Sequence, residues 1–258
     1  MNVLMVGDAV GRPGRRAIAA LLPALRRELN IDFVIANGEN AAGGRGLSVS
    51  AAQELIEAGV DVITSGNHIW DQKEIIPHLE SELPIIRPLN YPPGLPGVGL
   101  IEHRGVTVIN LQGRVFMTNI DCPFRKADKA LAQMPPKSIV IVDMHAEATS
   151  EKVAMGWYLD GRVSAVLGTH THVGTVDARI LPKGTAYISD VGMVGAKDSV
   201  IGDEVEAVIR RFLTAMPVRL EVARRGGLIF NSVLVEIDEE TALAERIERV
   251  DREIGDDK

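Results

Sequence analysis

The segment Val60–His68 reads V-D-V-I-T-S-G-N-H and contains the pattern that decides the fold. Its first part, Val60–Thr64, is a short apolar run that predicts a buried strand, and the polar tip S-G-N-H follows it. Two earlier segments have the same design. Val3–Val6 ends in G-D, and Phe33–Ala36 ends in N-G-E-N. Such tips follow the carboxyl ends of strands, which is where α/β sheets place their ligands.

Helices are expected between these strands. Arg15–Leu29 has apolar residues at helical spacing, and Pro13 stands near its start. Ser50 is a candidate N-cap for a second helix over Ser50–Ala58. The alternation of strand, polar tip and helix predicts an α/β fold with a partly parallel sheet. Because no Ser/Gly-rich linker divides the chain, we expect one domain over residues 1–258.

The rest of the chain predicts more strands and two more helices. Two strands end in histidine-bearing tips: Ser138–Val142 in D-M-H, and Val163–Leu167 in G-T-H-T-H. Further strands are expected at Val98–Glu102, Val106–Leu111, Arg179–Leu181, Ala186–Ile188 and Leu228–Ile237, and helices at Glu204–Leu213 and Glu239–Ile254. Irregular structure is expected over Pro84–Pro96 and in an insertion near residues 112–126.

Composition limits the classes of partner. The chain has 258 residues, a net charge of -7 and 4% aromatic residues, so no extended nucleic-acid surface is expected. Bound metal ions would have to attract an anionic substrate. The single cysteine, Cys122, excludes an intrachain disulfide and fits a reducing compartment. The chain shows no signal peptide and no apolar run of about 20 residues, so we expect a cytoplasmic protein without a membrane span.

Most of the predicted core strands end in a residue that can bind a metal. These candidate ligands are Asp8, Glu39, Asn40, Asn67, His145, His170 and His172. On an extended segment, H-x-H would place His170 and His172 on the same side, where they could serve two adjacent ions. Imidazole with carboxylate suits manganese, iron or zinc, and Glu39 has two oxygens with which to bridge two ions. Each tip alone could be a turn or a helix cap.

His68 follows Asn67 directly and points elsewhere, so it could stay free of metal. A free imidazole beside a metal-bound phosphate can protonate a departing alkoxide, which makes His68 the candidate general acid. The alternative is that His68 only hydrogen-bonds to a ligand. Asp71 lies one turn further on and could orient His68, or it could be a surface charge.

The order of these tips resembles the calcineurin-like metallophosphoesterases. Two departures are clear: Asp8 lacks the following histidine of D-x-H, and N-G-E-N replaces the bridging aspartate motif. Both departures are similar to one branch, the YmdB-like phosphodiesterases. The matching segments are Gly7–Gly14, Asn37–Gly46, Gly66–Trp70, Gly113–Met117 with Asp121–Phe124, and Asp190–Gly195.

The resemblance implies two mixed β-sheets sandwiched between helices and a centre of two metal ions, iron or manganese. Asp8, Glu39, Asn40 and His172 would hold one ion. Glu39, Asn67, His145 and His170 would hold the other, so Glu39 would bridge. The implied activity is hydrolysis of 2′,3′-cyclic nucleotides to 3′-nucleotides, with a metal-activated hydroxide as nucleophile and His68 as general acid.

Several alternatives stay open. The protein could be a broader metal-dependent phosphatase or nuclease, or a non-catalytic regulatory or RNA-linked protein on the same scaffold. Arg114 and Arg125 could approach substrate phosphate, although solvated charges are the more ordinary interpretation. The glycine-rich stretch Ala42–Gly46 lacks the ending of a P-loop and fits a loop beside a metal site. A homo-oligomer is compatible with the sequence.

Overall fold

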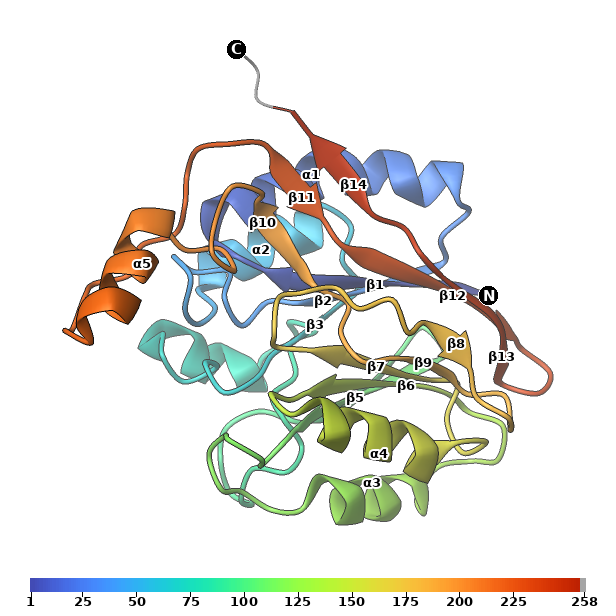
Figure 1. Ribbon diagram of the computed structural model, residues 1–258. Coiled ribbons are helices and arrows are strands. Elements are labelled where there is room, and N and C mark those ends of the chain that lie inside the picture. Colours follow the sequence, from blue (N-terminus) through green and yellow to red (C-terminus); the bar gives the residue numbers. More distant parts are fainter. Residues whose placement is uncertain (256–258) are drawn as a thin grey trace.

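The computed structural model describes residues 1–255 and contains two mixed β-sheets that pack face to face between helices (Figure 1). The first sheet has eight strands: β1 (Asn2–Ala9), β2 (Phe33–Asn37), β3 (Val62–Thr64), β10 (Met193–Ala196), β11 (Leu228–Phe230), β12 (Ser232–Asp238), β13 (Leu243–Arg249) and β14 (Arg252–Ile254). The second has six: β4 (Leu100–His103), β5 (Val106–Gln112), β6 (Ile139–His145), β7 (Ala165–Thr169), β8 (Arg179–Ile180) and β9 (Ala186–Ile188). The predicted fold class is confirmed.

Among the described residues, six helices accompany the sheets, and all but α5 pack against the body of the protein. They are α1 (Gly11–Glu28), α2 (Val49–Glu57), the 3-10 helix η1 (Lys73–Glu80), α3 (Pro123–Leu131), α4 (Thr149–Leu159) and α5 (Val205–Thr214). The core of the first sheet and its helices joins β1 and β2 to α1 and α2. A separate core lies between the second sheet and helices α3 and α4. Helix α5 buries only Val208 and projects from the body (Figure 1).

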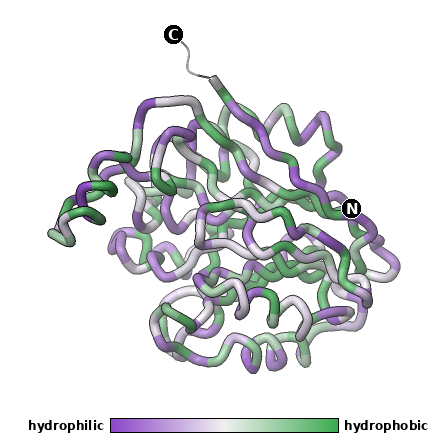
Figure 2. Tube along the Cα trace, viewed as in Figure 1, coloured by the Kyte–Doolittle hydropathy of each residue, from purple (hydrophilic) through white to green (hydrophobic). Residues whose placement is uncertain are grey.

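A third core lies between the two sheets and explains why the strands are apolar on both faces. Along β1, Leu4 and Val6 face the helices, whereas Val3 and Met5 face the second sheet. Because both faces of a central strand are buried, its sequence is a continuous apolar run and not an alternating one. The tube coloured by hydropathy is accordingly hydrophobic through the middle of the molecule (Figure 2).

The C-terminal prediction was wrong. Glu239–Ile254 forms no helix but two strands, with β13 antiparallel to β12 and β14 antiparallel to β11. The pairing brings Arg246 opposite Glu236, with a salt bridge of 3.0 Å. Antiparallel pairing with β12, the strand directly before it, thus overrides the local helix preference of this charged segment. The sequence interpretation also missed α3, α4 and β10, and α1 begins at Gly11, earlier than expected.

Gly7 shows how closely β1 approaches β10 beneath the site. A Cβ atom on Gly7 would lie 2.0 Å from the carbonyl oxygen of Gly192. That oxygen accepts the hydrogen bond of the Asp8 amide at 3.0 Å. The backbone at this point has no free volume for a methyl group.

We expect Gly7→Ala to lower the free energy of unfolding by about 3 kcal/mol, because backbone must separate from backbone. Urea unfolding followed by circular dichroism measures this loss. Gly255→Ala is the matched control, since no atom lies within 4 Å of its added Cβ. Equal midpoints for the two variants would contradict the prediction.

Among the described residues, no helix has the length and apolar character needed to cross a membrane.

Candidate metal centre

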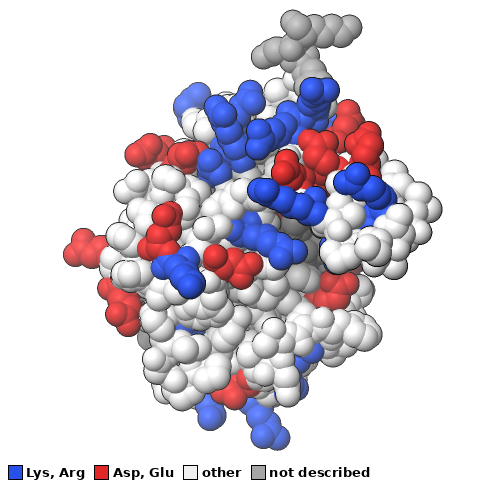
Figure 3. Space-filling model, turned by 90° about the vertical axis from the view of Figure 1, so that its left-hand side faces the viewer, with Lys and Arg blue, Asp and Glu red and all other residues white. Residues whose placement is uncertain are grey.

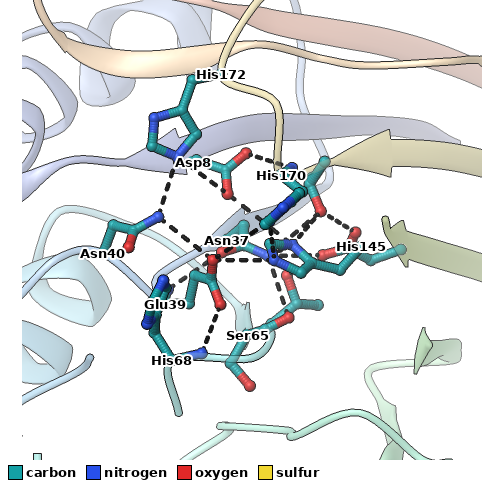
Figure 4. A network of polar contacts seen from close by, with 12 residues as sticks. Asp8, Asn37, Glu39, Asn40, Ser65, His68, His145, His170 and His172 are labelled. Atoms are coloured by element: carbon teal, nitrogen blue, oxygen red, sulfur yellow. Dashed lines mark hydrogen bonds and ion pairs between the residues drawn. The ribbon is translucent and has the colours of Figure 1, made fainter. Parts of the chain in front are cut away.

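Strand register brings the polar tips of both sheets to one end of the molecule. In the first sheet, Asp8 of β1 is level with Asn37 of β2, which is level with Thr64 of β3. In the second sheet, His145 of β6 is level with Thr169 of β7. The carboxyl ends of these parallel strands therefore face one shared space, in which the side chains of Figure 4 converge.

Glu39, His145 and His170 form the first half of the centre. Nε2 of His145 lies 2.9 Å from Oε1 of Glu39 and 3.0 Å from Nδ1 of His170. One ligand atom from each residue lies within 4.8 Å of the others, which is close enough to hold a metal ion. Glu39 and His145 are fully buried, so these groups are preorganised.

Asp8, Asn40 and His172 form the other half (Figure 4). Nε2 of His172 lies 3.9 Å from Oδ1 of Asp8 and 3.0 Å from Nδ2 of Asn40. Nδ2 of the Asn40 side chain also donates to Oε1 of Glu39 at 3.4 Å. Glu39 therefore touches both halves, as a bridging ligand must.

Among the described residues, five buried side-chain polar atoms have no hydrogen-bond partner, and two of these, Oδ1 of Asp8 and Oδ1 of Asn67, belong to candidate metal ligands. Asn67 follows Gly66, where a Cβ would lie 2.2 Å from the His145 ring and 2.4 Å from Glu39 Oε2. Buried acceptor atoms in native proteins almost always have a hydrogen-bond donor or an ion as partner. The unpaired oxygens beside this cluster therefore indicate a cation site. The donor set thus fits the metal ions that the resemblance implies.

Hydrogen bonds on the far side of each imidazole decide which nitrogen faces the centre. Nδ1 of His145 lies 2.8 Å from Oγ1 of Thr169, which donates its proton to Asp143 at 2.6 Å and so must accept from the histidine. Nδ1 of His172 donates to the carbonyl oxygen of Ile201 at 2.7 Å. Each ring is thereby oriented with Nε2 toward the centre, as metal-binding histidines require.

His170 has the opposite orientation. Its Nε2 lies 3.1 Å from Oε2 of Glu147, so Nε2 carries the proton and Nδ1 faces inward. Nδ1 of His170 and Nε2 of His145, 3.0 Å apart, would therefore present two lone pairs to each other. Only a proton or a metal ion between them makes this arrangement stable.

The pKa values follow from this crowding. Burial raises the pKa of Asp8 to about 6, against the attraction of His172 and His145. Burial also opposes ionisation of Glu39, but the charge and hydrogen bond of His145 lower its pKa to about 2. Burial opposes protonation of His145, but the charge and hydrogen bond of Glu39, together with the charges of Asp8 and Asp143, raise its pKa to about 9. Burial, then the charge on His145, lower the pKa of His170 to about 3. In the absence of metal, protonated His145 thus supplies the positive charge that stabilises the buried Glu39 carboxylate.

The expected geometry of the H-x-H segment was wrong, although both histidines reach the centre. Strand β7 ends at Thr169, and His170 and His172 have φ values of 103° and 66°. Such left-handed residues cost about 1–3 kcal/mol each and persist only where surrounding contacts enforce them. Oδ2 of Asp8 accepts the His170 amide at 3.1 Å, which is one such contact.

A buried ion pair fixes the residue between the two histidines. Oδ2 of Asp190 accepts from Nζ of Lys152 at 2.6 Å, from the Thr171 amide at 3.0 Å and from the Thr171 hydroxyl at 2.7 Å. Lys152 is 1% exposed and Asp190 is 1% exposed. A charged pair with this many hydrogen bonds holds the loop in its strained conformation.

The sequence interpretation missed the groups that orient the ligands: Asn37, Asp143, Glu147, Lys152, Thr169 and Asp190. A signal was present for four of them, because Asn37, Asp143, Thr169 and Asp190 lie inside the polar tips and the D-V-G-M motif. Nothing local distinguishes Lys152 or Glu147 from surface charges on a helix or loop.

The two arginines considered from sequence lie at the surface, and the glycine-rich stretch forms a loop. Arg114 and Arg125 are exposed, and the structure records no hydrogen bond of either side chain within the described residues. Gly43, Gly44 and Gly46 all have positive φ, so the stretch Ala42–Gly46 is a glycine-dependent loop that follows Asn40 directly.

Thr169→Val tests the hydrogen-bonded support of His145. Valine keeps the shape of threonine but removes the hydroxyl, so the ring loses its acceptor and Asp143 loses a donor. We expect metal affinity to fall about 10–100-fold, which a competition titration with a chelating dye measures. Thr185→Val is the control, because it removes a buried hydroxyl that donates to the Val163 carbonyl oxygen and to no candidate ligand; unchanged affinity in Thr169→Val would show that its hydroxyl has no such role.

The chain is similar to known proteins over nearly its whole length. A family model for YmdB-like proteins matches residues 4–250. The 2′,3′-cyclic-nucleotide 2′-phosphodiesterase of Bacillus subtilis (strain 168) is 48% identical, over 97% of this chain and 96% of that protein. The crystal structure of a hypothetical protein from Thermus thermophilus is 47% identical with a TM-score of 0.92, over 98% of this chain and 100% of that one. The crystal structure of a novel phosphatase from Mycoplasma pneumoniae is 35% identical with a TM-score of 0.93, over 100% of this chain and 95% of that one. The chain therefore belongs to the YmdB-like family.

Proposed function

We propose that this protein is a two-metal phosphodiesterase that hydrolyses 2′,3′-cyclic nucleotides to 3′-nucleotides. The observation that carries the proposal is the convergence of inward-facing imidazoles, buried carboxylates and unpaired oxygens at one end of two sheets. The name of the Bacillus subtilis relative supports the choice of a cyclic phosphodiester as substrate.

The proposed ligands divide into two groups that share Glu39. Asp8, Glu39, Asn40 and His172 would hold one ion; Glu39, Asn67, His145 and His170 would hold the other. Three imidazoles with two carboxylates suit iron or manganese better than magnesium or calcium, which prefer oxygen ligands alone. When bound, the pair of ions supplies Lewis acidity that activates water and neutralises the phosphate charge.

His68 is the proposed proton donor. Its amide donates to Oε2 of Glu39 at 3.0 Å, which fixes the residue at the edge of the centre. Its Nδ1 lies 2.9 Å from Oδ2 of Asp71, so Nδ1 donates to the carboxylate and Nε2 is left to exchange a proton with substrate. The attacking water would lose a proton to solvent as its oxygen bonds to phosphorus. As the O2′–P bond breaks, Nε2 would protonate O2′, leave the phosphate on O3′, and then regain a proton from solvent.

The test is an assay on 2′,3′-cyclic AMP with protein purified without added metal and then loaded with manganese or iron. We expect 3′-AMP as product, elemental analysis showing two ions per chain, and loss of turnover after chelation. Activity confined to phosphate monoesters would overturn the proposal in favour of a phosphatase. Absence of bound metal and of any hydrolysis would leave the non-catalytic alternative.

A further inference from the structure

A cleft of about 560 Å³ lies beside the proposed metal centre and is rich in arginine. Arg12 and Arg16 of α1 line one wall, and Arg219 and Arg224, from the segment after α5, line the other. Gly43, from the loop after Asn40, completes the rim.

The cleft has a strong positive charge in a chain of net charge -7. All four arginines are exposed, and Glu221 is the one acidic residue in the lining. Within the described residues, Glu221 pairs with Arg219 at 3.5 Å, and no salt bridge is recorded for Arg12, Arg16 or Arg224. At the end of the molecule that carries the site, Lys and Arg side chains gather over the upper part, with Asp and Glu side chains on either side of them (Figure 3). Unpaired guanidinium groups gathered in one cleft favour an anionic ligand.

Both walls of the cleft are bonded to segments that carry metal-ligand candidates. On one side, the amide of Gly11 donates to the carbonyl oxygen of Asn40 at 2.9 Å. On the other side, Val222 forms a β-bridge with Asp203. Asp203 lies two residues after Ile201, whose carbonyl oxygen accepts a hydrogen bond from Nδ1 of His172. The two walls meet at Gly44, because a Cβ there would lie 2.7 Å from a Val222 methyl group. The cleft therefore runs along the Asn40 and His172 side of the centre.

A cyclic mononucleotide has a single phosphate, which the metal centre would take. The four arginines would then have no anion to bind. Guanidinium groups match phosphate oxygens in pairs of parallel hydrogen bonds, so the cleft fits additional phosphate groups of the same substrate molecule.

We propose that the substrate is a short single-stranded oligoribonucleotide with a 2′,3′-cyclic phosphate at its 3′ end, whose internal phosphodiesters lie in the arginine cleft. A cyclic phosphate requires a ribose 2′-oxygen and ends the strand, so the strand extends from it in the 5′ direction alone. This inference rests on the proposed function and specifies the substrate class of the same site.

The double variant Arg16→Ala/Arg219→Ala tests it. We expect kcat/KM on a tetranucleotide ending in 2′,3′-cyclic phosphate to fall at least about 10-fold. The slope of log(kcat/KM) against the logarithm of salt concentration should become shallower by about 1.4 for two lost phosphate contacts. Turnover of 2′,3′-cyclic AMP should change less than about 2-fold, because neither arginine contacts the metal centre. Arg27→Ala/Lys183→Ala removes the same charge from exposed positions outside the cleft and should leave both substrates unaffected.

Three results would overturn the inference while the proposed function stands. These are equal kcat/KM of the parent protein on the two substrates, equal behaviour of the two double variants, or a parallel loss on both substrates in Arg16→Ala/Arg219→Ala. A parent protein inactive on 2′,3′-cyclic AMP but carrying metal would instead refute the proposed function. If the first variant unfolds at the assay temperature, Arg219→Gln/Arg224→Gln tests the same cleft from its other wall.

Discussion

Glu39→Gln is expected to empty the metal centre and to abolish hydrolysis. Glutamine has nearly the volume of glutamate, so the fully buried position stays filled. The change removes the negative charge that lies 2.9 Å from Nε2 of His145, and one of the two oxygens available for bridging. Loss of the shared ligand weakens both ions together, so we expect metal affinity to fall more than about 100-fold, beyond the loss typical of an outer-shell change.

Elemental analysis after gel filtration measures this outcome directly, with turnover of 2′,3′-cyclic AMP as the second readout. Glu54→Gln is the control, since Glu54 is an exposed partner of Arg15 outside the centre. A Glu39→Gln protein that keeps two ions per chain would show that Glu39 is not a ligand. A protein that keeps one ion would show that it does not bridge.

The positions of the site residues could be predicted from sequence because they follow buried strands. Asp8, Glu39 and His145 each come at or just after the end of an apolar run, and register then aligns those ends. Parallel pairing leaves few choices once the strands are known, so the convergence needed no distance information.

The backbone conformations of the segments that follow these strand ends could not be predicted from sequence. His170 and His172 adopt left-handed backbone because Asp8 and Asp190 hold the loop, and these contacts join residues that are distant in sequence. The C-terminal segment differs for another reason: β13 forms a hairpin with the neighbouring β12, and this cross-strand pairing decides the structure of a charged stretch. Local periodicity carries no information about partners that the fold brings from elsewhere.

His68→Ala is expected to keep both ions and lose turnover about 10²–10⁴-fold on 2′,3′-cyclic AMP, the usual contribution of a general acid. Metal is kept because the contact of His68 with Glu39 is made by its backbone amide, which alanine retains. A substrate whose leaving group needs no proton separates catalysis from structure. On bis(4-nitrophenyl) phosphate the variant should retain most of the parent activity.

Asp71→Asn gives the graded version of the same experiment. Asparagine can still accept from Nδ1 of His68 through its side-chain oxygen but lacks the carboxylate charge that lies 2.9 Å from the ring, so we expect a smaller loss than in His68→Ala. The loss should again be confined to the cyclic substrate, whereas equal losses on both substrates would point to distortion of the centre. Full activity of His68→Ala on 2′,3′-cyclic AMP would remove His68 from the mechanism and require that solvent protonate O2′.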